Sequence, residues 1–204
     1  LLEQLTAEGC RAMMVRADVS QRDQVEAMVR RVEETFGPVS LLVNNAGVAG
    51  QALFQDITDE LWHRYFSVNV DGAYHAIQAV LPAMLHHHEG CIINTSSICG
   101  LIGHMNTPEA YTATKGAITL LTKSVAARYG KDNIRCNSIH PATVDTPFVA
   151  ALMADPVKKQ ARLNEIPLGR LTSVEDVANA VLYLASDEAV SYTHLRAHET
   201  RHDL

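Results

Sequence analysis

The chain has 204 residues, of which 47% are hydrophobic and 20% are charged. That length suits one domain with a sizeable buried core and is too short for two. The formal net charge of −6 at pH 7 gives no reason to expect a nucleic-acid partner, and no apolar run is long enough to cross a bilayer.

The first part of the chain alternates short apolar runs with amphipathic stretches. Residues 11–18 predict a strand that ends near Asp18. Ser20, with Asp23 three residues later, predicts the N-terminus of a helix that Gly37 and Pro38 end. The apolar stripe of this helix is formed by Val25, Met28, Val29 and Val32.

The same alternation continues to residue 186 and predicts an α/β fold. Strands are expected at 40–47, 91–97 and 133–142, and helices at 57–69 continuing past Gly72, at 108–129 closed by Gly130, and at 173–186 capped by Ser173 with Asp176. Strands that are apolar on both faces and alternate with helices indicate a Rossmann-like, doubly wound parallel sheet with helices on each side.

Two groups of residues, the cysteines and a run of histidines, could suggest a metal site, but each has a better explanation. The four cysteines form no CxxC pair and fit no zinc template; they suit a reducing cytoplasm, and Cys91 and Cys136 lie in apolar runs that predict burial. His86 to His88 lie between a helix and a strand, where a solvated loop is the favoured interpretation. We therefore expect no metal site and a cytoplasmic protein.

Polar and small residues follow each predicted strand. Asp18 follows the first, residues 44–47 (Asn-Asn-Ala-Gly) the second, Ser96 and Ser97 the third, and residues 140–143 the fourth. The ends of parallel strands meet at one edge of a sheet, where ligands of open α/β sheets bind. These four stretches predict one cleft, although the residues at 44–47 alone fit an ordinary tight turn as well.

Tyr111 and Lys115 stand one helical turn apart, with small residues between and beside them. They share one helix face, and an ammonium near a phenol favours phenolate, so we expect the tyrosine pKa to be lowered and the phenol to act as a general acid or base. Ser97 ends the preceding strand, so its hydroxyl is expected to share the substrate oxygen. An incidental surface pair is the alternative for these two residues taken alone.

Together these motifs resemble the short-chain dehydrogenase/reductase family over residues 1–189. The resemblance rests on ADVS at 17–20, LVNNAG at 42–47, VNVDG at 68–72, INTSSICGLIG at 93–103, YTATK at 111–115, the segment 133–147 and PLGR at 167–170. It implies four catalytic residues: Ser97, preferred to Ser96 because Gly100 and Gly103 follow it; Tyr111 as acid/base; Lys115 as its partner; and Asn69, which bends its helix and anchors a proton-relaying water.

The resemblance also implies a nicotinamide cofactor, NAD or NADP, with NAD favoured. It assigns Asp18 and Val19 to the adenine ring, Asn44, Ala46 and Gly47 to the wall under adenine and its ribose, Lys115 and Tyr111 to the nicotinamide ribose, and Pro141, Val144 and Thr146 to the carboxamide loop. The implied reaction is reversible hydride transfer between a secondary alcohol and a ketone, both small molecules. A dinucleotide-binding redox sensor without turnover, and an inactive fragment of the enzyme, are the alternatives.

Three departures from the family pattern are visible. The family's first strand, glycine-rich turn, first helix and second strand are not found, so we expect a partial domain at 1–189 and no sequence signal for choosing NAD or NADP. Ala142 replaces the usual glycine after Pro141. The family's closing strand is also replaced. Residues 190–200 match a translated sequencing adapter, which predicts a non-native tail over 190–204.

Assembly is also implied by the resemblance rather than by the residues themselves. The helices around 73–85 and 110–129 commonly pair between subunits in this family, which predicts a dimer or homotetramer. Ala117, Leu120, Leu121 and Ser124 are candidates for that interface, and packing on their own sheet is the alternative.

Overall fold

The computed structural model describes residues 2–50, 52, 54–105 and 107–190, without the side chains of 148, 151 and 152. Its strands are β1 (Leu41–Asn44), β2 (Gly90–Thr95) and β3 (Ile134–Ile139). Its α-helices are α1 (Leu2–Ala7), α2 (Arg22–Phe36), α3 (Asp59–Phe66), α4 (Gly72–His87), α5 (Glu109–Tyr129), α6 (Ala150–Met153), α7 (Pro156–Asn164) and α8 (Val174–Ala185). None of the helices in the described part of the chain is long and apolar enough to span a membrane.

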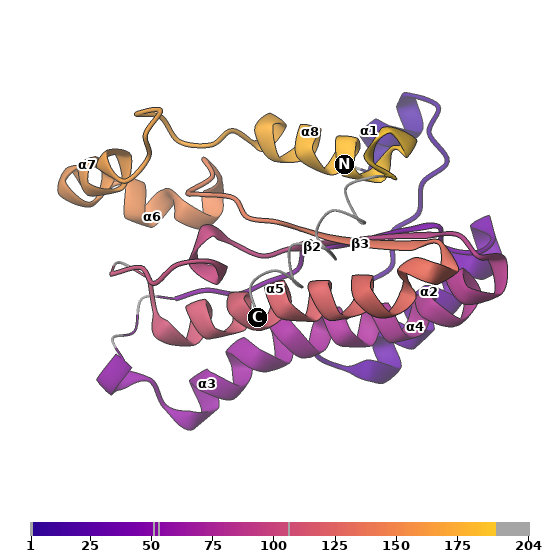
Figure 1. Cartoon of the computed structure of the whole chain (residues 1–204). Helices are drawn as coiled ribbons and strands as arrows, with labels where there is room; N and C mark the ends of the chain where they lie inside the picture. Colours follow the sequence, from indigo (N-terminus) through magenta and orange to yellow (C-terminus); the bar gives the residue numbers. More distant parts are fainter. Residues whose placement is uncertain (1, 51, 53, 106, 191–204) are drawn as a thin grey trace.

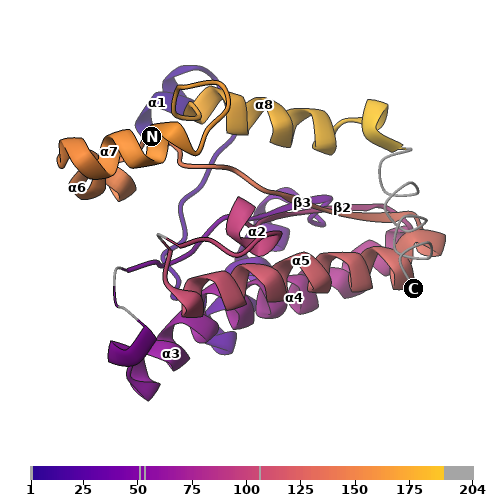
Figure 2. The same ribbon diagram turned by 60° about the vertical axis from the view of Figure 1, so that its left-hand side comes forward.

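The three strands form one parallel sheet in the order β1-β2-β3. The register pairs Asn44 with Asn94 and Thr95 with Ile139, so the carboxyl ends of the strands lie level. Figures 1 and 2 show α2, α4 and α5 on one face of the sheet and α8 on the other, with α6 and α7 beyond the strand ends. The predicted doubly wound parallel sheet is therefore confirmed.

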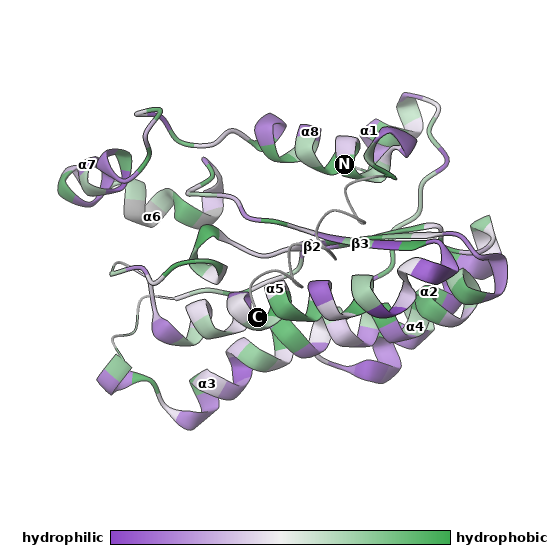
Figure 3. Ribbon diagram, viewed as in Figure 1, coloured by the Kyte–Doolittle hydropathy of each residue, from purple (hydrophilic) through white to green (hydrophobic). Residues whose placement is uncertain are grey.

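Alternation along β2 explains why both faces of the sheet are covered. Ile92 joins the larger core, with Val80, Met84 and Ile134, between the sheet and helices α4 and α5, whereas Cys91 and Ile93 point to a smaller cluster with Leu184 of α8. Figure 3 shows hydrophobic residues along α5 where it runs beneath the sheet. The predicted burial of Cys91 and Cys136 is confirmed.

Two helix starts follow the sequence pattern closely. The Thr58 side chain accepts from Leu61 N at 3.2 Å at the start of α3. At the start of α8, Ser173 and Asp176 form a full capping box: Asp176 N donates to Ser173 Oγ, and Ser173 N donates to Asp176 Oδ2, both at 3.0 Å. Each cap satisfies backbone groups that the first turn leaves without helical partners.

The prediction of a strand over 11–18 is wrong. A strand needs a hydrogen-bonded neighbour, and the sheet within the described residues begins at β1, so this segment has no ladder. The predicted cap at Ser20 is also wrong, because α2 begins at Arg22 after Gln21. Ser20 instead donates from its backbone N at 3.0 Å and from its Oγ at 2.8 Å to Asp18 Oδ1, which makes the turn before the helix.

Two predictions about helix ends also need correction. Helix α4 continues through His86 and His87, and His88 takes the left-handed position after it (φ 51°), so these residues form a helix end rather than a loop. Gly130 follows α5 with ordinary helical angles, and the chain turns at Asn133 (φ 59°) after a short 3-10 helix over Gly130–Asp132. Asparagine tolerates that conformation, so glycine is not needed there.

The predicted partial domain at 1–189 and the predicted missing elements stay predictions. Residues 191–204 of the predicted tail lie outside the residues that the structure describes.

Candidate active site

The carboxyl ends of the three strands carry the residues that the sequence grouped there. Residues 45–47 follow β1, Ser96 and Ser97 follow β2, and His140 and Pro141 follow β3. Hydrogen bonds tie the last two loops together: Ser96 N donates to Ile139 O at 2.9 Å and Ile98 N to Pro141 O at 3.1 Å. The cleft predicted from the strand ends is therefore built from adjoining loops.

Helix α5 brings Tyr111 and Lys115 to this edge. Lys115 is only 5% exposed, and its Nζ donates to the Thr95 carbonyl oxygen at the end of β2 at 2.7 Å. The same Nζ lies 5.6 Å from the centre of the Tyr111 ring. An ammonium has three donors, and the Thr95 carbonyl fixes one of them, which orients the lysine under the tyrosine.

Close packing of the loop after β2 on α5 explains why small residues matter here. A Cβ added at Gly100 would lie 2.7 Å from the Lys115 carbonyl oxygen and 2.5 Å from Ser96 Oγ, so only glycine fits. At Gly116, by contrast, an added Cβ would have nothing within 4 Å. The loop after β2 therefore approaches α5 most closely at Gly100, whereas the space beside Gly116 is open.

The two adjacent serines have different surroundings. Ser96 Oγ donates to the Lys115 carbonyl oxygen at 2.9 Å and lies 2.9 Å from Thr119 Oγ1, so it joins the loop to the α5 backbone. Ser97 caps a short 3-10 helix, Ile98–Gly100, by accepting from Cys99 N at 3.2 Å, and its side chain lies close enough to Tyr111 to lower the pKa of the phenol. The geometry brings Ser97, and not Ser96, to the phenol.

Burial has the largest effect on the pKa values of Tyr111 and Lys115. Desolvation raises the pKa of Tyr111 above its ordinary value, and the hydrogen bond from Ser97 offsets only part of this. Desolvation also lowers the pKa of Lys115 to about 8. The expectation that the ammonium lowers the tyrosine pKa is thus wrong for this structure, because removing the phenolate from water outweighs the attraction of a lysine turned toward Thr95.

Asn69 lies where the helical path from α3 to α4 passes through a π-helical segment, Ser67–Asp71. Its amide oxygen and both amide hydrogens have partners: Oδ1 accepts from Val48 N at 2.7 Å, and Nδ2 donates to Val48 O at 2.9 Å and Thr114 Oγ1 at 3.0 Å. The buried Asn69 therefore fastens the loop after β1 to α5, next to Lys115.

A flat ligand with hydroxyl groups fits the residues at this edge. Val19, Asn44, Ala46 and Asn69 line a cavity of about 110 Å³, enough for one ring or sugar of a dinucleotide. A Cβ at Gly47 would stand 3.4 Å from Asn69 Oδ1 and 3.7 Å from Lys115 Nζ, so its absence keeps the approach to the ammonium open. The donors and small residues present fit the predicted cofactor.

Other predicted cofactor residues lie away from that cavity. Asp18 is exposed, and its hydrogen bonds from Ser20 hold the pKa of its carboxyl below the ordinary value. Val144 forms an isolated bridge with Thr172, and Thr146 precedes a short 3-10 helix at 147–149, so both belong to the connection toward α6. The Pro141 carbonyl oxygen accepts from Ile98 N, so Pro141 ties the loop after β3 to the loop after β2.

Sequence reasoning missed several contributors to the site. The Thr95 carbonyl that holds Lys115 is a backbone group, and no residue type signals it. His140, whose Nδ1 lies 3.1 Å from the Ser97 carbonyl oxygen, was placed at the edge without a role. His104, Arg162 and Glu165 come together across 61 residues of sequence, which no local pattern indicates.

Comparisons with known proteins identify the family of the chain. A family described as enoyl-(acyl carrier protein) reductase matches residues 1–195. The 2-(S)-hydroxypropyl-CoM dehydrogenase 3 of Xanthobacter autotrophicus is 37% identical over 193 residues, 93% of this chain and 75% of that protein. The cyclopentanol dehydrogenase of Comamonas testosteroni is 36% identical over 191 residues, 94% of this chain and 76% of that one.

A solved structure is similar to this chain over most of its length. It is a gluconate 5-dehydrogenase from Burkholderia cenocepacia in complex with NADP and tartrate, with a TM-score of 0.88 and 31% identity over 93% of this chain and 74% of that one.

Proposed function

The chain belongs to the short-chain dehydrogenase/reductase family of NAD(P)-dependent oxidoreductases, and we propose that it interconverts a secondary alcohol and a ketone with Tyr111 as the acid/base. One observation carries this proposal. The Ser97 hydroxyl lies close to the Tyr111 phenol, and Lys115 is buried beside them at the carboxyl edge of the sheet. Such a convergence of titratable groups in a cleft is typical of an acid/base site.

A bound nicotinamide dinucleotide would supply the hydride acceptor or donor. We assign its adenosine end to Asp18, Val19, Asn44, Ala46 and Gly47, following the cavity that three of them line. Lys115 and Tyr111 would hold the nicotinamide ribose. Pro141, Val144 and Thr146 would form the loop around the carboxamide.

Tyr111 would move the proton. Because burial keeps its pKa above the ordinary value, the phenol is protonated at neutral pH and ready to donate to a ketone oxygen. Ser97 accepts from Cys99 N, so its one hydroxyl proton can turn from the phenol to donate to the same substrate oxygen. In alcohol oxidation the phenol must first lose its proton, so this direction is favoured at higher pH.

Lys115 would return protons to Tyr111, and Asn69 would hold the site in place. A lysine with a pKa of about 8 exchanges its proton near neutral pH much more readily than one at 10.5. Asn69 would act by position, because its amide is fully bonded and holds the loop after β1 against α5 at Lys115.

The proposal extends to the substrate class, the coenzyme, the location and the assembly of the protein. The relatives' names include hydroxypropyl-CoM and cyclopentanol dehydrogenases, which supports a small or medium secondary alcohol. We propose NAD as the coenzyme, and the neighbour solved with NADP makes NADP the alternative to test. The four free cysteines support a cytoplasmic location, and Leu120, 66% exposed on α5, supports a homo-oligomer through that helix.

The test combines binding with turnover. Fluorescence titration with NADH and with NADPH gives the coenzyme preference, and a panel of secondary alcohols and ketones assayed with both coenzymes gives the reaction. We expect saturable binding, and turnover with at least one alcohol–ketone pair. Binding without any turnover would favour a redox sensor, and no binding of either coenzyme would favour an inactive fragment.

A further inference from the structure

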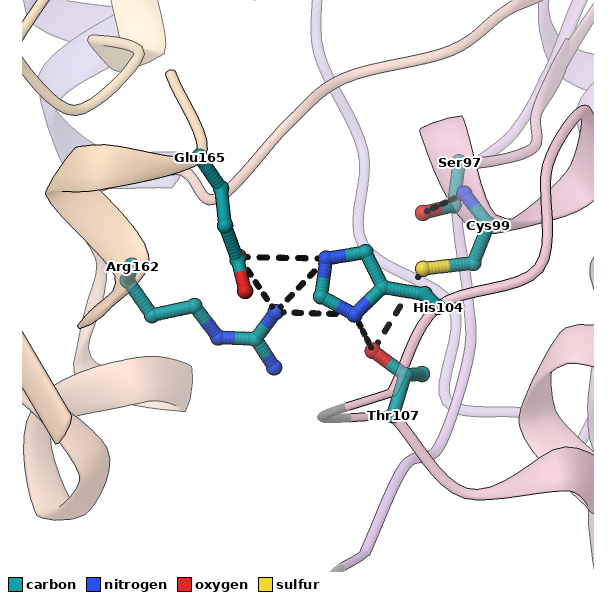
Figure 4. Close-up of polar contacts among 6 residues, drawn as sticks. All are labelled: Ser97, Cys99, His104, Thr107, Arg162 and Glu165. Carbon is teal, nitrogen blue, oxygen red and sulfur yellow. Dashed lines mark hydrogen bonds and ion pairs between the residues drawn. The ribbon is translucent and has the colours of Figure 1, made fainter.

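Helix α7 is held near the site by polar contacts more than by hydrophobic packing. None of its residues Pro156–Asn164 is buried. Instead, His104, from the loop after β2, reaches Glu165 at the end of α7, with 3.1 Å between His104 Nε2 and Glu165 Oε2. Arg162 Nη1 lies 3.1 Å from the same carboxylate oxygen and within 3.2 Å of both ring nitrogens (Figure 4).

The contacts continue from His104 to Ser97. Thr107 Oγ1 lies 3.2 Å from His104 Nδ1, and the Cys99 thiol donates to Thr107 Oγ1 at 3.4 Å. The backbone N of Cys99 donates to Ser97 Oγ at 3.2 Å. Figure 4 shows this path from α7 to the serine. We call Ser97, Cys99, Thr107, His104 and Glu165 the α7–Ser97 chain.

The donors in this chain have a consistent direction. A carboxylate only accepts, so we assign a proton on His104 Nε2 toward Glu165, and in that tautomer Nδ1 accepts. Arg162 Nη1 then donates to Glu165 Oε2 rather than to Nε2. The Thr107 hydroxyl then donates to Nδ1 and accepts from the thiol. The side chains of His104 and Arg162 are 13% and 11% exposed, so water replaces lost partners poorly here.

We propose that His104 and Thr107 are positioning residues that couple the docking of α7 to the orientation of the Ser97 hydroxyl. The inference rests on the proposed function, in which Ser97 shares the substrate oxygen with Tyr111. When α7 docks, Glu165 fixes the ring, the ring fixes Thr107, and Thr107 holds the Cys99 side chain whose backbone N–H bonds Ser97. Substrate enclosure and the arrangement of the acid/base site then occur together.

Thr107→Val is the central test, because it keeps the side-chain shape and removes the hydroxyl. We expect kcat/KM for the alcohol to fall about tenfold, the effect of one hydrogen bond, mostly in kcat, with the Kd for NADH unchanged. Thr107→Ser returns the hydroxyl and should recover most of the loss. Gln160→Ala, at an exposed position of α7 where Gln160 bonds only Asn164, is the control and should match wild type.

Coupling is measured by combining Thr107→Val with Glu165→Gln. If His104 links the two residues, the double variant loses less than the product of the single losses, and the two losses become independent in a His104→Ala background. Independent losses in the wild-type background, or a Thr107→Val enzyme equal to wild type, would overturn the proposal.

Hydrogen exchange provides a readout that needs no turnover. Glu165→Gln should speed amide exchange in α7 and also in residues 97–103, at the other end of the chain of contacts. Faster exchange confined to α7 would overturn the coupling even in a protein that oxidises no alcohol. Absence of turnover in the wild type would contradict only the proposed reaction.

Discussion

Replacing Gly100 by alanine tests whether the loop after β2 must touch the α5 backbone for Ser97 to meet Tyr111. The added Cβ would stand 2.7 Å from the Lys115 carbonyl oxygen, 2.8 Å from its carbonyl carbon and 2.5 Å from Ser96 Oγ. Two of these three atoms belong to helix backbone, which cannot rotate away as a side chain can. The loop and the helix must therefore move apart.

The magnitude follows from the overlap. Overpacking of this kind lowers the free energy of unfolding by about 1–3 kcal/mol. A displacement approaching 1 Å between Ser97 and Tyr111 lowers kcat by up to about 10²-fold. Urea denaturation measures the first effect, and steady-state kinetics with the preferred alcohol measures the second.

Gly116→Ala, in the helix α5 that this loop touches, is the matched control. Its added Cβ has no atom within 4 Å, and alanine in a helix interior should raise the free energy of unfolding by about 0.5–1 kcal/mol without loss of turnover. A Gly100→Ala protein as stable and active as wild type would refute the packing argument. So would equal damage from both substitutions.

Two further predictions concern cations, the buried Lys115 and the partly buried Arg135. The folded protein releases the Lys115 proton from about pH 8, whereas the unfolded chain keeps it to 10.5, so the free energy of unfolding should rise between these values by on the order of 3 kcal/mol. Lys115→Met should abolish this rise in pH-dependent urea titrations, and an unchanged pH profile would contradict the burial effect. Arg135→Met should lower the free energy of unfolding by about 2–3 kcal/mol, because the guanidinium donates to the carbonyls of Leu184, Ala185 and Ser186 at the end of α8. Arg135→Lys should recover part of the loss in the same urea titration, and a Met variant as stable as wild type would refute the assignment.

Elements that depend on local chemistry could be predicted from the sequence. The apolar runs of β2 and β3 and the capping box at Ser173 are fixed by residue type and spacing. The strand ends also located the site, because a parallel sheet brings its carboxyl ends to one edge whatever the loops contain. Residues 11–18 look like a strand locally, but pairing depends on a neighbour that their own sequence cannot specify.

The electrostatics of the site could not be predicted from spacing. A spacing of four places Tyr111 and Lys115 on one helix face, but it does not tell how deeply each is buried or that Lys115 turns to Thr95. Burial sets the direction of both pKa shifts. The His104 cluster depends on where α7 docks, which is a tertiary property.

Turnover by the Tyr111→Phe protein tests the central claim most directly. The substitution removes only the phenolic oxygen, so coenzyme binding and the free energy of unfolding serve as internal controls. We expect kcat for alcohol oxidation and for ketone reduction to fall on the order of 10²-fold or more, with NADH binding retained. Undiminished turnover in either direction would contradict the assignment of Tyr111 as the acid/base.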